Sequence, residues 1–262
     1  MRGPRTLALA TVAVSLGLCV IAAAQGIENT AYLKGAAPPD TALVLAPAPA
    51  AGSPAATADR TIFRATRALE GTPRWALAQR DVNEAIPAMM GDFSCAVGAS
   101  LDPASAPRLN AIFLRLRFDV LAAVNGPKAL YRRQRPFLID QGDICVPRTD
   151  SLARSPDYPS GHATWSWTLG LVIAELAPDR AAQVLSRARA FGESRVVCGV
   201  HNASAIEAGR TNAAALVAAL HGDQTFRSDM DLARTEMARL RHTAGRSAAC
   251  GAETALTART PW

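Results

Sequence analysis

Residues 163–176 decide the fold, and they read A-T-W-S-W-T-L-G-L-V-I-A-E-L. Apolar residues lie on almost every side of a helix drawn through this stretch, and Glu175 is its one charged residue. A helix that is apolar all round has to be covered on all sides. The sequence therefore predicts a central, fully buried helix here.

Six further stretches have apolar residues at helical spacing, and together they predict the rest of the fold. Strand-like alternation is nearly absent, alanine is abundant and aromatic residues are only 5% of the chain, which favours helix over sheet. The six stretches are 58–69, 75–90, 106–124, 179–197, 204–220 and 228–242. We expect an all-α fold, a single helical bundle of about seven main helices.

The first 24 residues have the features of a secretory signal peptide. Arg2 and Arg5 give a positive start, residues 7–21 are almost all apolar, and three alanines at 22–24 suit cleavage. The alternative is an uncleaved membrane anchor, although the apolar run is short for a span. No later stretch is long and apolar enough to cross a bilayer. The expected location is periplasmic or secreted, with no stable membrane span after cleavage.

The remaining chain divides by composition into a leader, a domain and a tail. Residues 25–57 are rich in Ala and Pro, 58–246 form the expected domain, and 247–262 are a tail that is loose unless Cys250 ties it down. Four cysteines remain after export, Cys95, Cys145, Cys198 and Cys250. Their even number favours two disulfides in an oxidising compartment, with three pairings open.

The charge balance limits the kinds of partner. The formal charge is +6, which suits anionic substrates but is too diffuse to indicate nucleic acid. The sequence leaves open whether the protein forms a homo-oligomer.

The tetrapeptide P-S-G-H at 159–162 stands directly before the apolar helix. A helix start offers free N–H groups and a partial positive charge, which attract an anion. Ser160 can add a hydroxyl donor, Gly161 lets the backbone approach closely, and His162 would stand beside the bound anion. The alternative is a plain helix cap with an incidental histidine.

Two cationic segments flank this motif in sequence. In the first, K-A-L-Y-R-R-Q-R-P, Lys128 and Arg135 can bind phosphate oxygens, while Arg132 and Arg133 are assigned to a solvated face. The second, S-R-V-V-C-G-V-H, holds Arg195 and His201. Its alternatives are an ordinary core histidine and, at Cys198, a catalytic thiol.

The three segments occur in the order K-x6-R-P, P-S-G-H and S-R-x5-H. In this the chain resembles the bacterial class A non-specific acid phosphatases. They belong to the type 2 phosphatidic acid phosphatase superfamily, which includes the vanadium haloperoxidases. The similarity runs from about residue 58 to about residue 240 and implies a haloperoxidase-like helical core.

The resemblance implies a role for each matched residue. His201 would attack phosphorus and become a phosphohistidine, while His162 would protonate the leaving alcohol and then activate water. The three non-bridging oxygens would be held by Lys128, Arg135, Ser160, Gly161 and Arg195. The resemblance implies no metal and no other cofactor, small phosphate monoesters as substrates, and phosphate or vanadate as inhibitors.

One position departs from the family pattern, which ends S-R-x5-H-x3-D. The aspartate that orients the nucleophilic histidine falls at Ala205, which has no carboxylate. Glu207 is a candidate replacement, although Ser204-x-x-Glu207 also reads as a capping box. The amide oxygen of Asn202 is another.

The sequence therefore predicts a secreted, metal-independent acid phosphatase and leaves two alternatives. Because of Ala205, the first is a catalytically weakened protein that binds phosphate or another oxyanion, in which restoring Asp at 205 would create activity. The second is a vanadate-dependent peroxidase that uses the same pocket.

Overall fold

The computed structural model describes residues 30–33, 39–243 and 250–262. All regular structure within these ranges is helical, which confirms the all-α prediction. The described residues hold ten α-helices, α2 to α11, where about seven main ones were expected. The predicted signal peptide at 1–24 lies outside the described residues.

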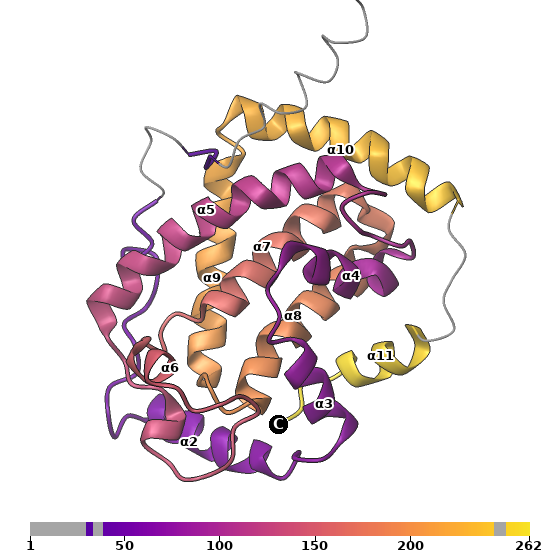
Figure 1. Ribbon diagram of the computed structural model, residues 1–262. Helices are drawn as coiled ribbons and strands as arrows, with labels where there is room; N and C mark the ends of the chain where they lie inside the picture. Colours follow the sequence, from indigo (N-terminus) through magenta and orange to yellow (C-terminus); the bar gives the residue numbers. More distant parts are fainter. Residues whose placement is uncertain (1–29, 34–38, 244–249) are drawn as a thin grey trace, which may run out of the picture.

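Helix α7 (Gly161–Leu176) forms the centre of the bundle, and it packs mainly against α8 (Ala181–Val197) and α9 (Ala203–Leu220) (Figure 1). Eleven of its sixteen residues are buried, so the predicted central helix is confirmed. It is not buried on every side, because Trp167, Leu171 and Glu175 form a narrow, partly exposed stripe.

Two glycines allow this close packing. A Cβ atom on Gly170 would lie 2.5 Å from the Cβ of Ala188 on α8. A Cβ on Gly209 of α9 would lie 2.8 Å from the Ser160 carbonyl oxygen at the start of α7. Both distances are shorter than carbon and oxygen atoms tolerate, so any larger residue would push the helices apart.

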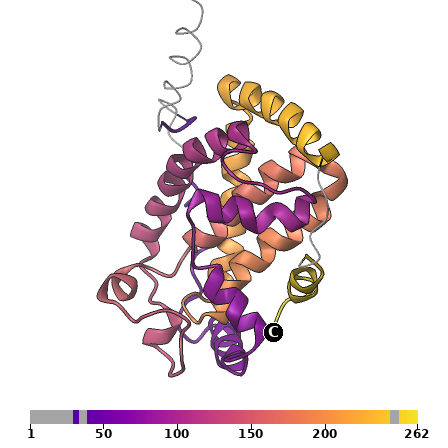
Figure 2. The same ribbon diagram turned by 45° about the vertical axis from the view of Figure 1, so that its right-hand side comes forward.

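The outer helices surround this core. Helix α10 (Gln224–Thr243) lies at one end and α2 (Pro54–Arg67) at the other, in both views (Figure 1, Figure 2). Helix α5 (Pro107–Tyr131) begins beside α10 and runs along the bundle toward the α2 end. The single helix predicted at 75–90 is two helices, α3 (Pro73–Arg80) and α4 (Ile86–Val97). The break has a local reason, since Pro87 has no N–H to continue a helix through it.

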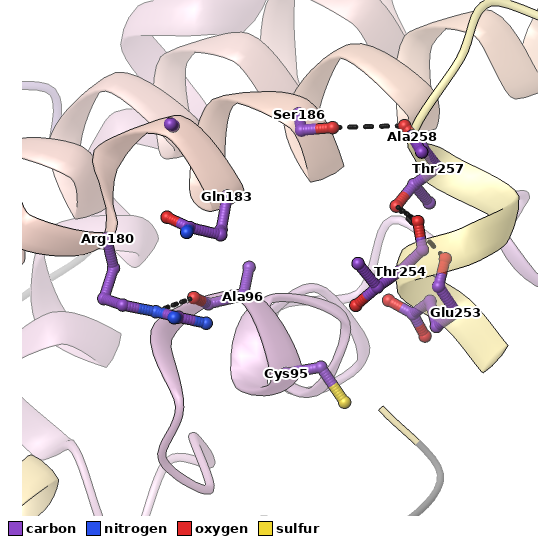
Figure 3. A pocket seen from close by; sticks show the side chains of 10 residues that line it. Cys95, Ala96, Arg180, Gln183, Ser186, Glu253, Thr254, Thr257 and Ala258 are labelled. Atoms are coloured by element: carbon purple, nitrogen blue, oxygen red, sulfur yellow. Dashed lines mark hydrogen bonds between the residues drawn. The ribbon is translucent and has the colours of Figure 1, made fainter. Parts of the chain in front are cut away.

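Two disulfides tie distant segments together and settle the pairing. Cys95 of α4 is bonded to Cys250, and Cys145 is bonded to Cys198. The first holds α11 (Cys250–Thr257) against the bundle. This is the bond at Cys250 on which the expectation of an ordered tail depended. Ser186 also donates a hydrogen bond to the Thr257 carbonyl (Figure 3). The second excludes a free thiol at Cys198.

A mostly irregular segment connects α5 to α7 and includes the short helices η1 (Pro136–Leu138) and α6 (Asp150–Arg154). It lies at the α2 end of the bundle (Figure 1). The end of α5, the start of α7 and the α8–α9 junction contact this segment, so all three sequence motifs meet at this end. In the described part of the chain, no helix is both long and apolar enough to cross a bilayer.

Candidate active site

His201 lies at the α8–α9 junction and is only 3% exposed. Its Nδ1 is 2.9 Å from Asp157 Oδ1, and its Nε2 is 3.1 Å from Arg135 Nη1. The chain reaches this position through Gly199, whose φ of 77° favours glycine. A Cβ at Gly199 would also lie 2.6 Å from Arg67 Nη1, so a larger residue would displace that guanidinium group as well.

These two contacts fix the tautomer of His201. A guanidinium group only donates hydrogen bonds, so Nε2 must accept from Arg135. The ring proton is then on Nδ1 and is donated to Asp157. Burial lowers the pKa of His201 well below its usual value, and the nearby charges of Arg135 and Lys128 lower it further. The ring is therefore neutral, with its lone pair on Nε2.

Three largely buried cations, Arg135, Lys128 and Arg195, act electrostatically on His201, and Arg135 contacts its Nε2 directly. Burial is the main cause that lowers the pKa of Lys128 to about 8 and those of Arg135 and Arg195 to about 10. Lys128 Nζ donates to the Pro156 carbonyl at 2.6 Å, and Arg135 Nε donates to the Ser155 carbonyl at 2.7 Å. Backbone carbonyls thus hold two of the cations in place without neutralising them.

Arg195 is the most informative of the three. The side chain is buried, and its Nε and Nη1 have no hydrogen-bond partner. Leaving a buried charged donor unpaired costs about 1–3 kcal/mol or more, so such groups are rare in folded proteins. An oxyanion with several acceptor oxygens would satisfy both donors.

The start of α7 adds a neutral donor set. Ser160 is the N-cap and is fully buried, and its Oγ accepts from Ala163 N at 3.3 Å. Its own hydroxyl hydrogen stays available to donate. Gly161 is the first residue of the helix, where N–H groups have no intrahelical partner. The sequence prediction of a helix start at P-S-G-H is confirmed.

His162 lies one residue further on, and its side chain is 21% exposed. Its ring stacks on Phe191, with Nδ1 3.4 Å from Glu84 Oε1 and Nε2 3.4 Å from the Val82 carbonyl. Both contacts are long for hydrogen bonds. Burial lowers the pKa of His162 well below its usual value, and Arg195 and His201 lower it further.

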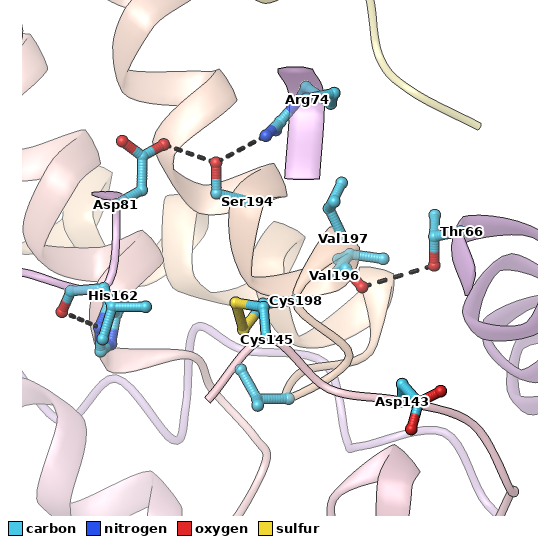
Figure 4. Close-up of a disulfide and its surroundings, with 12 residues drawn as sticks. Thr66, Arg74, Asp81, Asp143, Cys145, His162, Ser194, Val196, Val197 and Cys198 are labelled. Carbon is cyan, nitrogen blue, oxygen red and sulfur yellow. Dashed lines mark hydrogen bonds between the residues drawn. A yellow bond between two sulfur atoms is a disulfide. The ribbon is translucent and has the colours of Figure 1, made fainter. Parts of the chain in front are cut away.

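Ser194 belongs to the third motif, and its contacts hold the backbone that carries Arg195. Its hydroxyl donates to Asp81 Oδ2 at 2.5 Å and accepts from Arg74 Nη1 at 2.9 Å, as Figure 4 shows. The Cys145–Cys198 disulfide lies in the same region. These contacts fix the end of α8, from which Arg195 projects.

Glu207 does not orient His201, and this corrects one expectation. Its side chain is 64% exposed and accepts from Arg210 at 2.7 Å, while Asp157 holds the His201 ring. The capping-box reading is also wrong, since Asn202 is the N-cap of α9 and makes no side-chain cap. Asn202 donates to Asp157 through both its backbone N and its Nδ2.

Arg133 corrects a second expectation. It was assigned to a solvated face, yet its side chain is 13% exposed and forms ion pairs with Asp59 at 2.8 Å and with Asp157 at 3.4 Å. Arg132, by contrast, is exposed as predicted.

The sequence reasoning missed Asp157, although it lies just before the P-S-G-H motif. Two features together could have found it. Asp157 lies two residues before a motif that is expected to share a pocket with His201, and His201 lacks its expected carboxylate at position 205. Among the described residues, no group of three or more His, Cys, Asp or Glu side chains could hold a metal ion.

Comparison with known proteins agrees with this geometry. A family model described as the PAP2 superfamily matches residues 110–228. An acid phosphatase of Zymomonas mobilis subsp. mobilis is 41% identical over 206 residues, which cover 78% of each chain. The non-specific acid phosphatase of Providencia stuartii is 31% identical over 212 residues, covering 80% of this chain and 86% of the relative. That of Salmonella typhi is 32% identical over 195 residues, covering 74% and 78%.

Proposed function

The chain belongs to the PAP2 superfamily, and on that premise we propose that it is a secreted acid phosphatase. It would hydrolyse small phosphate monoesters without a metal ion, through a phosphohistidine at His201. The curated relatives are named as acid phosphatases and match three quarters or so of this chain.

The observation that carries this proposal is the pair of unpartnered donors on buried Arg195, whose positive charge acts on the pKa of His201, together with the unprotonated Nε2 of that histidine. Lys128 and Arg135 supply two further cations, and the start of α7 supplies neutral donors. A phosphoryl group has three non-bridging oxygens, which can accept hydrogen bonds from these donors. It also has an electrophilic phosphorus, which the lone pair of His201 Nε2 can attack.

In the first chemical step, His201 Nε2 would donate its lone pair to phosphorus as the bond to the ester oxygen breaks. His162 would give its proton to that oxygen, so that the product leaves as a neutral alcohol. His162 must be protonated for this step. A bound phosphate dianion favours that form, because its charge opposes the effect of Arg195 on the His162 pKa.

In the second step, water would attack the phosphorus of the phosphohistidine and give its proton to His162. The P–N bond breaks, phosphate leaves, and both histidines return to their starting states. In both steps the cations stabilise the negative charge of the five-coordinate transition state, which is the role that metal ions have in other phosphatases.

Secretion is supported by residues 1–24, whose pattern is that of a signal peptide. The two disulfides fit an oxidising compartment such as the periplasm. The non-catalytic binder was motivated by Ala205, and the contact of Asp157 with His201 removes that motivation.

Hydrolysis of p-nitrophenyl phosphate at mildly acid pH, with a chelator present, tests the proposal. We expect full turnover with the chelator and a loss of at least about 10⁴-fold in His201→Ala. His221→Ala is the matched control, because His221 is a half-exposed histidine that pairs with Glu175. Turnover abolished by the chelator, or undiminished in His201→Ala, would reject the proposal.

A further inference from the structure

Asp157 is a fully enclosed carboxylate next to His201, with 0% exposure. Its Oδ1 faces His201 Nδ1 at 2.9 Å and accepts from Asn202 N at 3.1 Å. Its Oδ2 accepts from Asn202 Nδ2 at 2.8 Å and lies 3.4 Å from Arg133 Nη1. Four groups therefore converge on its two oxygens.

This arrangement requires an ionised carboxylate. Arg133, the Asn202 backbone and the Asn202 amide can only donate to it in these contacts. If Asp157 carried a proton, it would have to donate it to His201 Nδ1. The imidazole would then carry its proton on Nε2, directly against the donor of Arg135 at 3.1 Å. Only an ionised Asp157 and a protonated Nδ1 satisfy every contact.

A buried carboxylate needs a counter-charge, and the structure supplies one that is itself fixed. Arg133 Nη2 binds Asp59 at 2.8 Å, and Arg133 Nη1 donates to Ser204 Oγ at 2.6 Å. Ser204 donates back to Asp59 through its backbone N at 2.9 Å. The network joins α2, the end of α5 and the start of α9, so Asp157 is held from outside the pocket.

Ala205 belongs to the same arrangement. Its carbonyl accepts from Ser160 N at 3.0 Å, and its side chain packs with Tyr158 in a small buried cluster. A small side chain at 205 thus lets the 157–160 segment lie directly on the first turn of α9. That contact brings Asp157 to the His201 ring.

We infer that Asp157, with Arg133 as its counter-ion, is the positioning residue for the nucleophile His201. It occupies the role left empty at Ala205 but comes from a different segment of the chain. The inference rests on the proposed function for its kinetic consequence. Asp157 accepts the Nδ1–H bond, holds Nε2 toward the phosphoryl group and stabilises the positive ring that forms when Nε2 is phosphorylated. It takes no proton itself.

The first test is kinetic and uses Asp157→Asn in the mature protein. We expect kcat to fall by about 10²- to 10⁴-fold, since the corresponding change in serine proteases costs about 10⁴-fold. The dissociation constant of inorganic phosphate should stay within about threefold, because Lys128, Arg135 and Arg195 are unchanged.

Asp119→Asn is the matched control. Asp119 is 1% exposed and accepts from the backbone N–H groups of Tyr32 and Leu33, on α5 and away from the imidazoles. It should lose stability while kcat is unchanged. Wild-type kcat in Asp157→Asn, or a parallel loss of phosphate affinity in a folded protein, would overturn the inference.

The second test is made on the wild-type protein and needs no enzymatic activity. Nitrogen-15 NMR of the histidine side chains in the wild-type protein reports which ring nitrogen carries the proton, and His201→Ala assigns the signal. Protonation of Nδ1 in the neutral ring supports the inference, and protonation of Nε2 overturns it. If the wild type shows no phosphatase activity, the proposed function fails while this measurement still decides the position of Asp157.

Discussion

The two histidines of the site are held very differently. His201 is 3% exposed, and its ring nitrogens have partners at 2.9 and 3.1 Å. His162 is 21% exposed at its side chain, and its partners both lie at 3.4 Å. The difference matches the proposed chemistry. A nucleophile needs one fixed tautomer, whereas an acid that becomes a base must gain and lose a proton in each cycle.

Replacing His162 should have the largest effect among the changes that sharpen this comparison. We expect His162→Ala to lower kcat by about 10²- to 10⁴-fold for an alkyl phosphate, whose alcohol must be protonated as it leaves. The loss should be much smaller for p-nitrophenyl phosphate, because that leaving group is stable as an anion. Steady-state kinetics with both substrates checks this. Equal losses on the two substrates would contradict an acid role for His162.

Placing a carboxylate at position 205 tests whether His201 already has the carboxylate that orients its ring. Ala205 is fully buried, and Asp157 already accepts the Nδ1 proton. Ala205→Asp should therefore lower the free energy of unfolding by about 3 kcal/mol without raising kcat, because it adds an unpaired buried charge. Urea unfolding and kinetics measure the two quantities. A gain in kcat would show that the nucleophile lacks an orienting group.

Lys128 should give the site a pH limit that depends on neither histidine. Its pKa is lowered to about 8 by burial first and then by Arg135, so it loses its positive charge as the pH rises through 8. The dissociation constant of phosphate should then rise by up to about tenfold per pH unit between about pH 8 and pH 9. In Lys128→Met, affinity should be weaker at neutral pH and nearly flat over this range. A wild-type profile as flat as that of the variant would contradict the prediction.

Glu84 should have the smallest effect, because its contact with His162 is long. Its carboxylate favours the protonated imidazole, so Glu84→Gln should lower the His162 pKa and reduce kcat by about three- to tenfold. The pH–kcat profile should shift to lower pH, and Glu207→Gln on the exposed face serves as the control. A shift to higher pH would mean that Glu84 does not act on His162.

Much of the fold followed from the sequence because helical periodicity and burial are local signals. The continuous apolar character of 163–176 predicted the central helix, and P-S-G-H predicted its start. The break between α3 and α4 was missed because residues 75–90 keep their apolar spacing across it. The cysteine pairing could not be deduced, since it depends on where four distant segments meet.

The candidate site was only partly predictable for a related reason. The motifs named the side chains that surround Nε2, and the structure brings Lys128, Arg135 and Arg195 into the electrostatic environment of His201. The partner of Nδ1 was sought within six residues along the chain, at Glu207. The structure supplies it from 44 residues earlier, at Asp157, through a tertiary contact that periodicity does not reveal. Arg133 was misassigned because its counter-ions, Asp59 and Asp157, are also distant in sequence.

The most direct test of the account is the covalent intermediate. The protein is mixed with excess substrate in the presence of a chelator, quenched rapidly in base to preserve phosphohistidine, digested and mapped by mass spectrometry. We predict phosphate on His201, absent from His162 and present at a lower level in Asp157→Asn. Turnover without any phosphorylated His201, or phosphate on a different residue, would contradict the account.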